Sequence, residues 1–248
     1  MDLHLSTIDN EAPVLARTHG LGLEVTEYCT PSFLDEEYRE ADRLVREAVR
    51  GVRGRILHAP FCELCPAAVD PLVVDVTRRR FRQALSVARS YGMKRMVVHS
   101  GFLPMLYHEG WFAERTVRFW QDFLTGVEAD ECIVVENVFE RTPDLLVGIA
   151  AAVADPRLRL CLDIGHANVS GKGVPMEAWI DAAAPFLAHV HVHNNYGDTD
   201  AHNAPQEGTV DMAAALGRIA SACPEATFTL ECRDDEKALA WLESRSLL

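Results

Sequence analysis

The chain has 248 residues and a formal net charge of −13, from 24 Lys and Arg against 37 Asp and Glu. Proteins that bind nucleic acid gain much of their affinity by neutralising phosphates with basic side chains, so this charge argues against DNA or RNA as a partner. No apolar run is long enough to cross a membrane, and Met1–Thr7 is too short and polar for a signal peptide. Seven scattered cysteines are typical of a reducing, cytoplasmic location rather than of a disulfide framework.

Strand and helix patterns alternate along the whole chain, no linker divides it, and a hydrophobic content of 48% is enough for one large core. The predicted strands are Leu3–Thr7, Gly22–Cys29, Gly54–Phe61, Arg95–Gly101, Cys132–Val138, Leu158–His166, Leu187–Asn195 and Ala226–Cys232. The predicted helices are Glu11–His19, Asp35–Arg50, Asp70–Tyr91, Trp111–Leu124, Pro143–Val153, Pro175–Phe186, Val210–Cys223 and Asp234–Arg245.

This alternation implies an α/β fold with parallel strands and right-handed crossovers. Eight units in about 250 residues predict a single (β/α)8 TIM barrel that spans residues 1–248. A doubly wound open sheet is the alternative, but no Gly-rich phosphate loop follows the first strand.

Polar residues at the strand ends favour the barrel over the open sheet. The third to eighth strands each have one such residue near the C-terminal end, namely His58, His99, Glu136, Asp163, His191 and Glu231. In a barrel, and only there, these ends meet at one active-site mouth. A buried carboxylate after a β-branched run, such as Glu136, needs a cation because burying it unpaired is costly. His58 or His99 taken alone is more often structural.

The stretch Leu187–Asp211 gives the strongest indication of a metal. His189, His191 and His193 alternate with valines, so their imidazoles project to one face of a strand. An Asp-x-His pair, Asp200 and His202, follows in a polar loop. Imidazole beside carboxylate is the ligand combination of Zn²⁺ and similar ions, whereas buried, hydrogen-bonded histidines are the alternative.

Other polar residues are placed outside the metal site. Glu24 and Glu27 are three positions apart, so they face opposite sides of their strand and both are left out. The remaining histidines are assigned to structure or to the orientation of ligands, namely His4, His19, His108, His189 and His193.

Seven motifs together resemble the xylose-isomerase-like barrels, a group that includes sugar isomerases and epimerases, endonuclease IV and AP endonuclease family 2 relatives. They are LHAPF, VVHSG, VVENV, CLDIGHAN, HVHVHNN, DAHNAPQEG and TLEC, between Ile56 and Cys232. In the isomerases, one metal is held by Glu, Asp, His and Glu, which here are Glu136, Asp163, His191 and Glu231.

The resemblance to endonuclease IV implies up to three metals, with zinc expected first and Mn, Fe or Co as alternatives. His58 and His99 would bind the first metal, and Glu136 would bridge it to the second. Asp163, His191 and Glu231 would complete the second site. His166, which follows Asp163 after Ile-Gly, would hold the third metal together with Asp200 and His202.

This full ligand set favours a metal-dependent phosphoester hydrolase, specifically a phosphodiesterase, that acts on a small phosphorylated molecule. Metal coordination lowers the pKa of water towards ~7, and the catalytic candidates are Glu136, Glu231 and His202. The runner-up is a sugar or sugar-phosphate isomerase or epimerase with one divalent metal, in which Glu136 and Glu231 exchange protons with the substrate carbon. An AP endonuclease ranks lower because the chain is acidic, and a barrel that binds a ligand without turnover ranks last.

Candidate substrate contacts are Phe61, Phe102, Tyr107, His193 and Asn194. Phe61 matches a residue that wedges into DNA in the endonuclease relatives, but no Arg or Lys accompanies it here. The apolar loop Gly101–Tyr107 either packs on the following helix or forms a hydrophobic lid over a ligand. Cys62 and Cys65 are interpreted as loop packing, with a redox role as the alternative.

Overall fold

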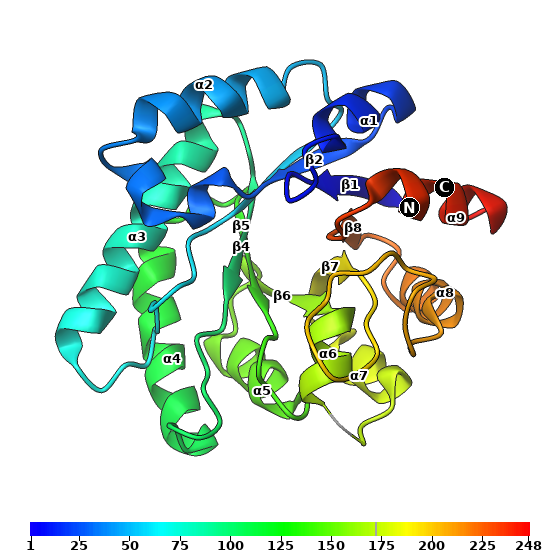
Figure 1. The fold of residues 1–248 in the computed structure, drawn as a ribbon. Helices are drawn as coiled ribbons and strands as arrows, with labels where there is room; N and C mark the ends of the chain where they lie inside the picture. The colour runs from blue at the N-terminus through cyan, green and yellow to red at the C-terminus, as the bar shows by residue number, and fades with distance from the viewer. Residues whose placement is uncertain (172) are drawn as a thin grey trace.

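Eight parallel strands close into a barrel in the computed structural model, which describes residues 1–171 and 173–248 (Figure 1). The strands pair in chain order, and β8 pairs with β1 to close the ring. They are β1 (Asp2–Ser6), β2 (Gly22–Val25), β3 (Arg55–His58), β4 (Arg95–His99), β5 (Cys132–Glu136), β6 (Leu158–Asp163), β7 (Leu187–Val192) and β8 (Thr227–Leu230). The predicted (β/α)8 barrel is therefore confirmed.

Helices form the outer ring (Figure 1). They are α1 (Ala12–His19), α2 (Tyr38–Ala48), α3 (Pro71–Ser90), α4 (Glu109–Phe123), α5 (Asp144–Val153), α6 (Ile164–Ser170), α7 (Met176–Ala183), α8 (Met212–Ala222) and α9 (Asp235–Ser244). Short 3-10 helices are η1 (Glu27–Cys29), η2 (Pro31–Leu34) and η3 (Leu124–Gly126). In the described part of the chain, no helix combines the length and apolarity needed to cross a membrane.

Each predicted strand ends one or more residues later than the observed one, and two of these differences have a clear structural cause. The second was predicted to reach Cys29, but β2 ends at Val25 because the chain turns into η1. The sixth was predicted to reach His166, but β6 ends at Asp163, whose side chain accepts a hydrogen bond from the His166 amide at 2.6 Å and caps α6. Helix α6, which positions His166, is not among the predicted helices.

Strand periodicity separates two hydrophobic layers. Side chains at alternate positions, such as Leu57, Val98 and Val135, pack outward against the helices. The inward positions of β3 to β6 form a separate small cluster of Ile56, Val97, Val134 and Cys161. Each of these four lies two residues before a candidate metal ligand and therefore points to the same side of its strand. The apolar inner layer thus forms a floor beneath the polar mouth of the barrel.

The inward positions of β2, β7 and β8 are polar instead. Glu24, His189, His191 and Thr229 are fully buried there, and they are connected by hydrogen bonds. Most barrel interiors are filled by branched apolar side chains, so this half of the interior is unusual. It places a buried polar network directly next to the candidate site.

Candidate metal centre

The described residues form five overlapping groups of potential metal ligands, two of which are Glu24, His58, His191 and Glu231, and Cys161, His189 and His191. The other three groups, referred to below as the three clusters, contain all nine residues predicted as metal ligands, together with His193. The first cluster is His58, His99 and Glu136. The second is Glu136, Asp163, His191 and Glu231. The third is His166, His193, Asp200 and His202. Within each cluster the potential ligand atoms lie within 4.8 Å of one another, a spacing that one divalent ion can bridge.

Glu136, at the end of β5, belongs to the first two clusters. Its Oε2 lies 3.2 Å from His58 Nε2 and 3.5 Å from both His99 Nε2 and His191 Nδ1. Its Oε1 lies 3.0 Å from His166 Nδ1. One carboxylate therefore faces imidazoles from four elements, which is the placement that a bridging ligand requires.

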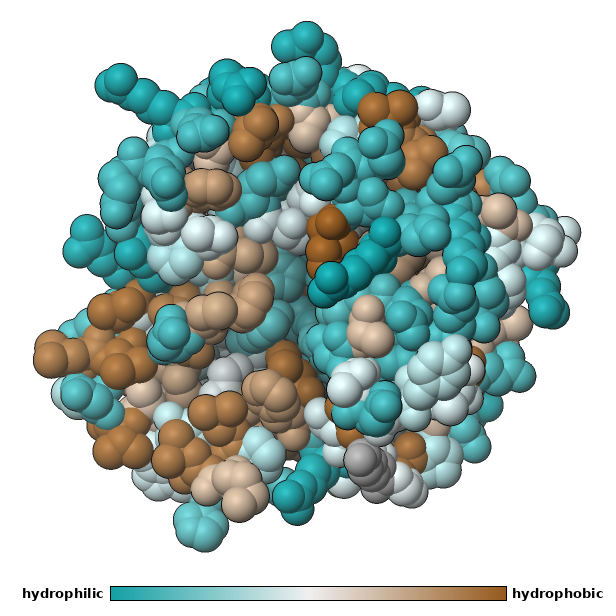
Figure 2. Space-filling model, in the orientation of Figure 1, coloured by the Kyte–Doolittle hydropathy of each residue, from teal (hydrophilic) through white to brown (hydrophobic). Residues whose placement is uncertain are grey.

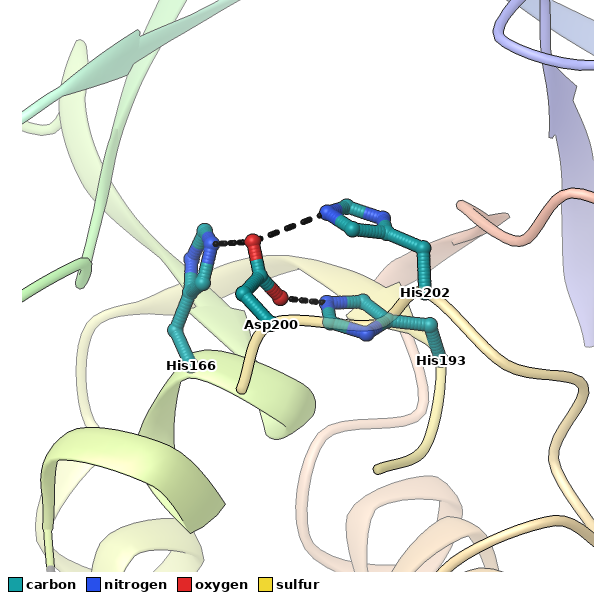
Figure 3. Close-up of side chains that lie close together, drawn as sticks. All are labelled: His166, His193, Asp200 and His202. Atoms are coloured by element: carbon teal, nitrogen blue, oxygen red, sulfur yellow. Dashed lines mark hydrogen bonds and ion pairs between the residues drawn. The ribbon is translucent and has the colours of Figure 1, made fainter. Parts of the chain in front are cut away.

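Asp200 likewise faces several imidazoles, those of the third cluster (Figure 3). Its Oδ2 lies 3.1 Å from His166 Nε2 and 3.0 Å from His202 Nε2, and its Oδ1 lies 3.8 Å from His193 Nε2. The loop after β7 delivers both Asp200 and His202, and His202 has a left-handed backbone (φ 49°) that few non-glycine residues adopt. His202 Nδ1 is held by the Glu231 carbonyl at 2.7 Å, which leaves Nε2 turned towards Asp200.

The buried charges of these clusters fit divalent cations. Within residues 1–171 and 173–248, the ion-pair partners of Glu136, Asp163, Asp200 and Glu231 are all histidines, with no Lys or Arg among them. His191 Nδ1 and Glu231 Oε2 are buried, lie 3.2 Å apart and lack hydrogen-bond partners among the described residues. Buried groups of this kind are rarely left unsatisfied, so the chemistry of the cluster matches a metal.

Protons take the place of cations when no metal is bound. Burial alone would raise the pKa of Asp163, but the charges of His166 and His193 hold it well below its usual range. Burial alone would lower the pKa of His166, but the Asp163 charge and the Asp200 hydrogen bond raise it well above its usual range. In contrast, burial lowers the pKa of His99 to about 3, so this imidazole is neutral and ready to act as a ligand.

Glu24 is a part of the site that the sequence analysis left out. Its Oε1 accepts a hydrogen bond from His191 Nε2 at 3.0 Å, and its Oε2 accepts bonds from His189 Nε2 at 2.9 Å and from the Thr229 hydroxyl at 2.6 Å. A carboxylate that binds one nitrogen of an imidazole fixes the other nitrogen as a metal ligand. Glu24 therefore orients His191 so that Nδ1 faces the second cluster.

The alternation of β2 contained the signal for Glu24. Leu23 and Val25 flank it and pack outward, so Glu24 must point into the barrel. Glu27 lies beyond the end of the strand, in η1, and its carboxylate instead accepts a hydrogen bond from Thr7 at 2.9 Å.

Gly165 lies inside α6 and allows this helix to pack closely on the site. A Cβ on Gly165 would lie 1.9 Å from the His193 ring, so the glycine allows α6 to approach that imidazole closely.

The predicted substrate contacts divide into two sets. Phe61, Phe102 and Tyr107 line a cavity of about 990 Å³ that also contains ligands from all three clusters. His193 and Asn194 are fully buried and do not line this cavity, because the chain folds back on itself after β7. His193 Nε2 contacts Asp163 at 3.0 Å, and the Asn194 amide donates to the carbonyls of Pro205 and Val210. His193 is therefore a potential ligand of the third cluster, and Asn194 holds the loop in place.

Cysteines also surround the cavity. Cys29, Cys62 and Cys65 line it and are free thiols. Cys29 Sγ lies 3.1 Å from His58 Nδ1 and thereby contacts the nitrogen of His58 that faces away from Glu136. Cys62 is exposed and Cys65 is buried.

The comparisons with known proteins agree with this fold. The family model described as xylose isomerase-like TIM barrel matches residues 15–248. The chain therefore belongs to the xylose isomerase-like TIM-barrel family, and its strand ends have the buried His, Glu and Asp clusters of a metal-binding enzyme of that family.

Individual relatives are distant. An uncharacterized protein of Methanocaldococcus jannaschii is 26% identical over 206 residues, which are 79% of this chain and 68% of that protein. A Thermus thermophilus protein, solved after soaking with ZnCl2, is 27% identical with a TM-score of 0.76 and covers 98% of this chain and 97% of its own. A D-tagatose 3-epimerase-like protein has a TM-score of 0.77 at 21% identity. The match covers 100% of this chain and 98% of that chain, and it shows a likeness of fold. Further structures with this fold are named as sugar 3-epimerases.

We expect Glu24→Gln to lower zinc affinity by about tenfold or more, because the variant loses the charged acceptor that orients His191. Competition with a chromogenic chelator would measure the affinity, and thermal unfolding of the metal-free protein would check the fold. Glu27→Gln is the matched control, since Glu27 lies outside the three clusters, and it should bind zinc like the wild type. Equal affinities of the wild type and Glu24→Gln would contradict this role.

We also expect zinc binding to release protons. Burial lowers the pKa of His202, but the Asp200 hydrogen bond and the Glu231 charge outweigh it and raise the pKa to about 9. The imidazole is therefore protonated at pH 7.5 without metal and must lose that proton to coordinate, so zinc affinity should fall as the pH is lowered from 9 towards 6. Calorimetry in two buffers of different ionisation enthalpy would count the protons. Zinc affinity that is independent of pH, with no release, would refute this expectation.

Proposed function

We propose that this chain is a metal-dependent hydrolase of a phosphate ester, specifically a phosphodiester, in a small molecule. The observation that supports this proposal best is the number of clusters. An isomerase or epimerase of the resembled kind needs one metal, yet the first and third clusters supply ligands for two more around the same cavity. Clusters that share or adjoin a bridging carboxylate are typical of multinuclear sites for displacement at phosphorus.

Each cluster would hold one divalent metal ion, and such ions would ionise a water and stabilise charge on the phosphoryl oxygens. Glu136 orients the site because its two oxygens face imidazoles of all three clusters. Asp200 and His202 lie at the more exposed side of the site and contact the cavity, and we assign them to stabilising the ester oxygen that leaves. In this reaction water adds to phosphorus, one P–O bond breaks, and the leaving alcohol takes a proton.

A small substrate fits the surroundings better than nucleic acid. Among the described residues that line the cavity there is no Lys or Arg, and the chain has a net charge of −13. A DNA-binding surface requires basic groups that neutralise several backbone phosphates. The negative charge of the substrate phosphate would therefore be neutralised by metal ions.

A sugar or sugar-phosphate epimerase is the second candidate, and the names of the solved structures with this fold favour it. In that reaction only the second cluster takes part, with Glu136 and Glu231 moving protons to and from carbon. The likeness to those named epimerases is at or below 21% identity, which supports the fold rather than the activity. The first and third clusters would then have no assigned task.

One substitution separates the two candidates. His202→Ala should lower kcat on a chromogenic phosphodiester by on the order of 10²-fold, because it removes a ligand of the third cluster. The matched control is His108→Ala, which removes an exposed imidazole that makes no capping hydrogen bond and belongs to no cluster. Metal content would be measured in parallel for both variants.

The wild type decides between the reactions directly. Absence of phosphodiester hydrolysis with Zn, Mn, Fe and Co, combined with solvent deuterium exchange into a ketose, would replace the proposed hydrolase with the epimerase. Hydrolysis that His202→Ala leaves unchanged would keep the reaction and exclude the third cluster from it.

A further inference from the structure

The cavity beside the metal clusters has two chemically different sides. One side consists of the cluster residues, among them His58, Glu136 and His202. The other side is mainly apolar, although Glu63 and Asp70 also line it, and it is built by the loop after β3 with the start of α3, the loop after β4 and the loop after β5. These segments contribute Leu64, Val73, Phe102, Leu106 and Phe139. We refer to these five residues, with Phe61, as the apolar wall.

The apolar wall continues onto the surface. Figure 2 shows hydrophobic side chains gathered beside the central hollow, on the side where α3 and α4 lie in Figure 1. Leu106 is 66% exposed, Phe139 is 49% exposed, and Val69 and Met105 nearby are 71% and 91% exposed. Large apolar side chains that cluster at the entrance of a site, rather than scattering singly, indicate a surface that becomes covered in function.

The wall is held in a fixed shape before any ligand arrives. Gly101 has a left-handed backbone (φ 73°), and a Cβ there would lie 2.8 Å from the Leu64 carbonyl, so the loop after β4 rests closely on the loop after β3. Phe102 packs edge-on against Phe112, with ring centroids 5.0 Å apart. Tyr107 stacks on Trp111 at 5.7 Å. Preorganised walls of this kind bind without a large ordering cost.

Phe61 connects the wall to the metal ligands. Its ring stacks on the His99 imidazole with centroids 4.2 Å apart and meets the His58 ring edge-on at 5.8 Å. An apolar group that lies against Phe61 is therefore next to the first cluster. The wall and the clusters belong to one binding site rather than to two separate surfaces.

We propose that the substrate has a bulky, uncharged, largely apolar group beside its phosphate ester, an aromatic ring system rather than a free sugar, and that the apolar wall takes this group. This inference rests on the proposed phosphate-ester function and adds the substrate class. A sugar would leave several hydroxyls facing apolar side chains without hydrogen-bond partners, which costs binding free energy. An aromatic group of matching size removes the exposed wall from water instead.

The test compares two phosphate monoesters that share the same head group. With zinc-loaded protein, calorimetry should show that 2-naphthyl phosphate binds at least about tenfold more tightly than ribose 5-phosphate. Leu106→Ser should weaken binding of 2-naphthyl phosphate at least about threefold and leave binding of ribose 5-phosphate unchanged. Leu72→Ser is the matched control, because Leu72 is 70% exposed in α3 but does not line the cavity, and it should change neither affinity.

Two results would overturn the inference. One is ribose 5-phosphate binding as tightly as 2-naphthyl phosphate. The other is an equal effect of Leu106→Ser and Leu72→Ser on binding of 2-naphthyl phosphate. That result would mean that the exposed apolar side chains bind the naphthyl group nonspecifically. The two probes are monoesters and lack the phosphodiester bond that the proposed hydrolase cleaves, so binding is measured apart from that reaction and the two proposals fail separately. Tight naphthyl binding without hydrolysis of any phosphodiester would refute the hydrolase alone, and hydrolysis without naphthyl preference would refute the apolar subsite alone.

Discussion

The structure depends on one electrostatic constraint: several carboxylates are buried at the mouth of the barrel with only histidines as partners. Glu136, Asp163 and Glu231 lie at the ends of β5, β6 and β8, and burial of such charges is unfavourable unless cations offset them. Protonated imidazoles supply that charge when no metal is bound, and divalent ions would supply it in the working protein. The same constraint accounts for the shared position of Glu136 and for the unsatisfied atoms of His191 and Glu231.

A second feature of the structure lies deeper in the barrel, beneath the metal clusters. An apolar floor closes the interior below β3 to β6, whereas Glu24, His189 and Thr229 extend the polar network below β7 and β8. The polar network holds His191 through the hydrogen bond to Glu24, and the orientation of His191 sets the second cluster. On the opposite side, the apolar wall begins at Phe61, directly beside His99. The metal clusters therefore lie between a buried polar network that orients their ligands and an apolar wall that faces the substrate.

Much of this arrangement could be predicted from the sequence, because it follows from local periodicity. Alternation and the repeated strand–helix unit identified all eight strands, and a polar residue near the end of each of the third to eighth strands identified the mouth. The errors occurred where the outcome depended on contacts distant in sequence. Glu24 was left out because the strand was drawn too long, and its partners His189 and His191 lie 165 and 167 residues away. The buried positions of His193 and Asn194 depend on how the loop after β7 folds back to pair with Asn203, which no periodicity indicates.

The activity depends on how many metals the clusters hold, and metal content tests this most directly. Elemental analysis of the wild type and of Glu136→Gln, after equilibration with zinc and removal of excess metal, would measure the number of ions per chain. The account predicts about three ions in the wild type, one for each cluster, and a loss of about two in Glu136→Gln because Glu136 belongs to two clusters. About one ion in the wild type, held by the second cluster, would contradict it and make the site that of a mononuclear isomerase or epimerase.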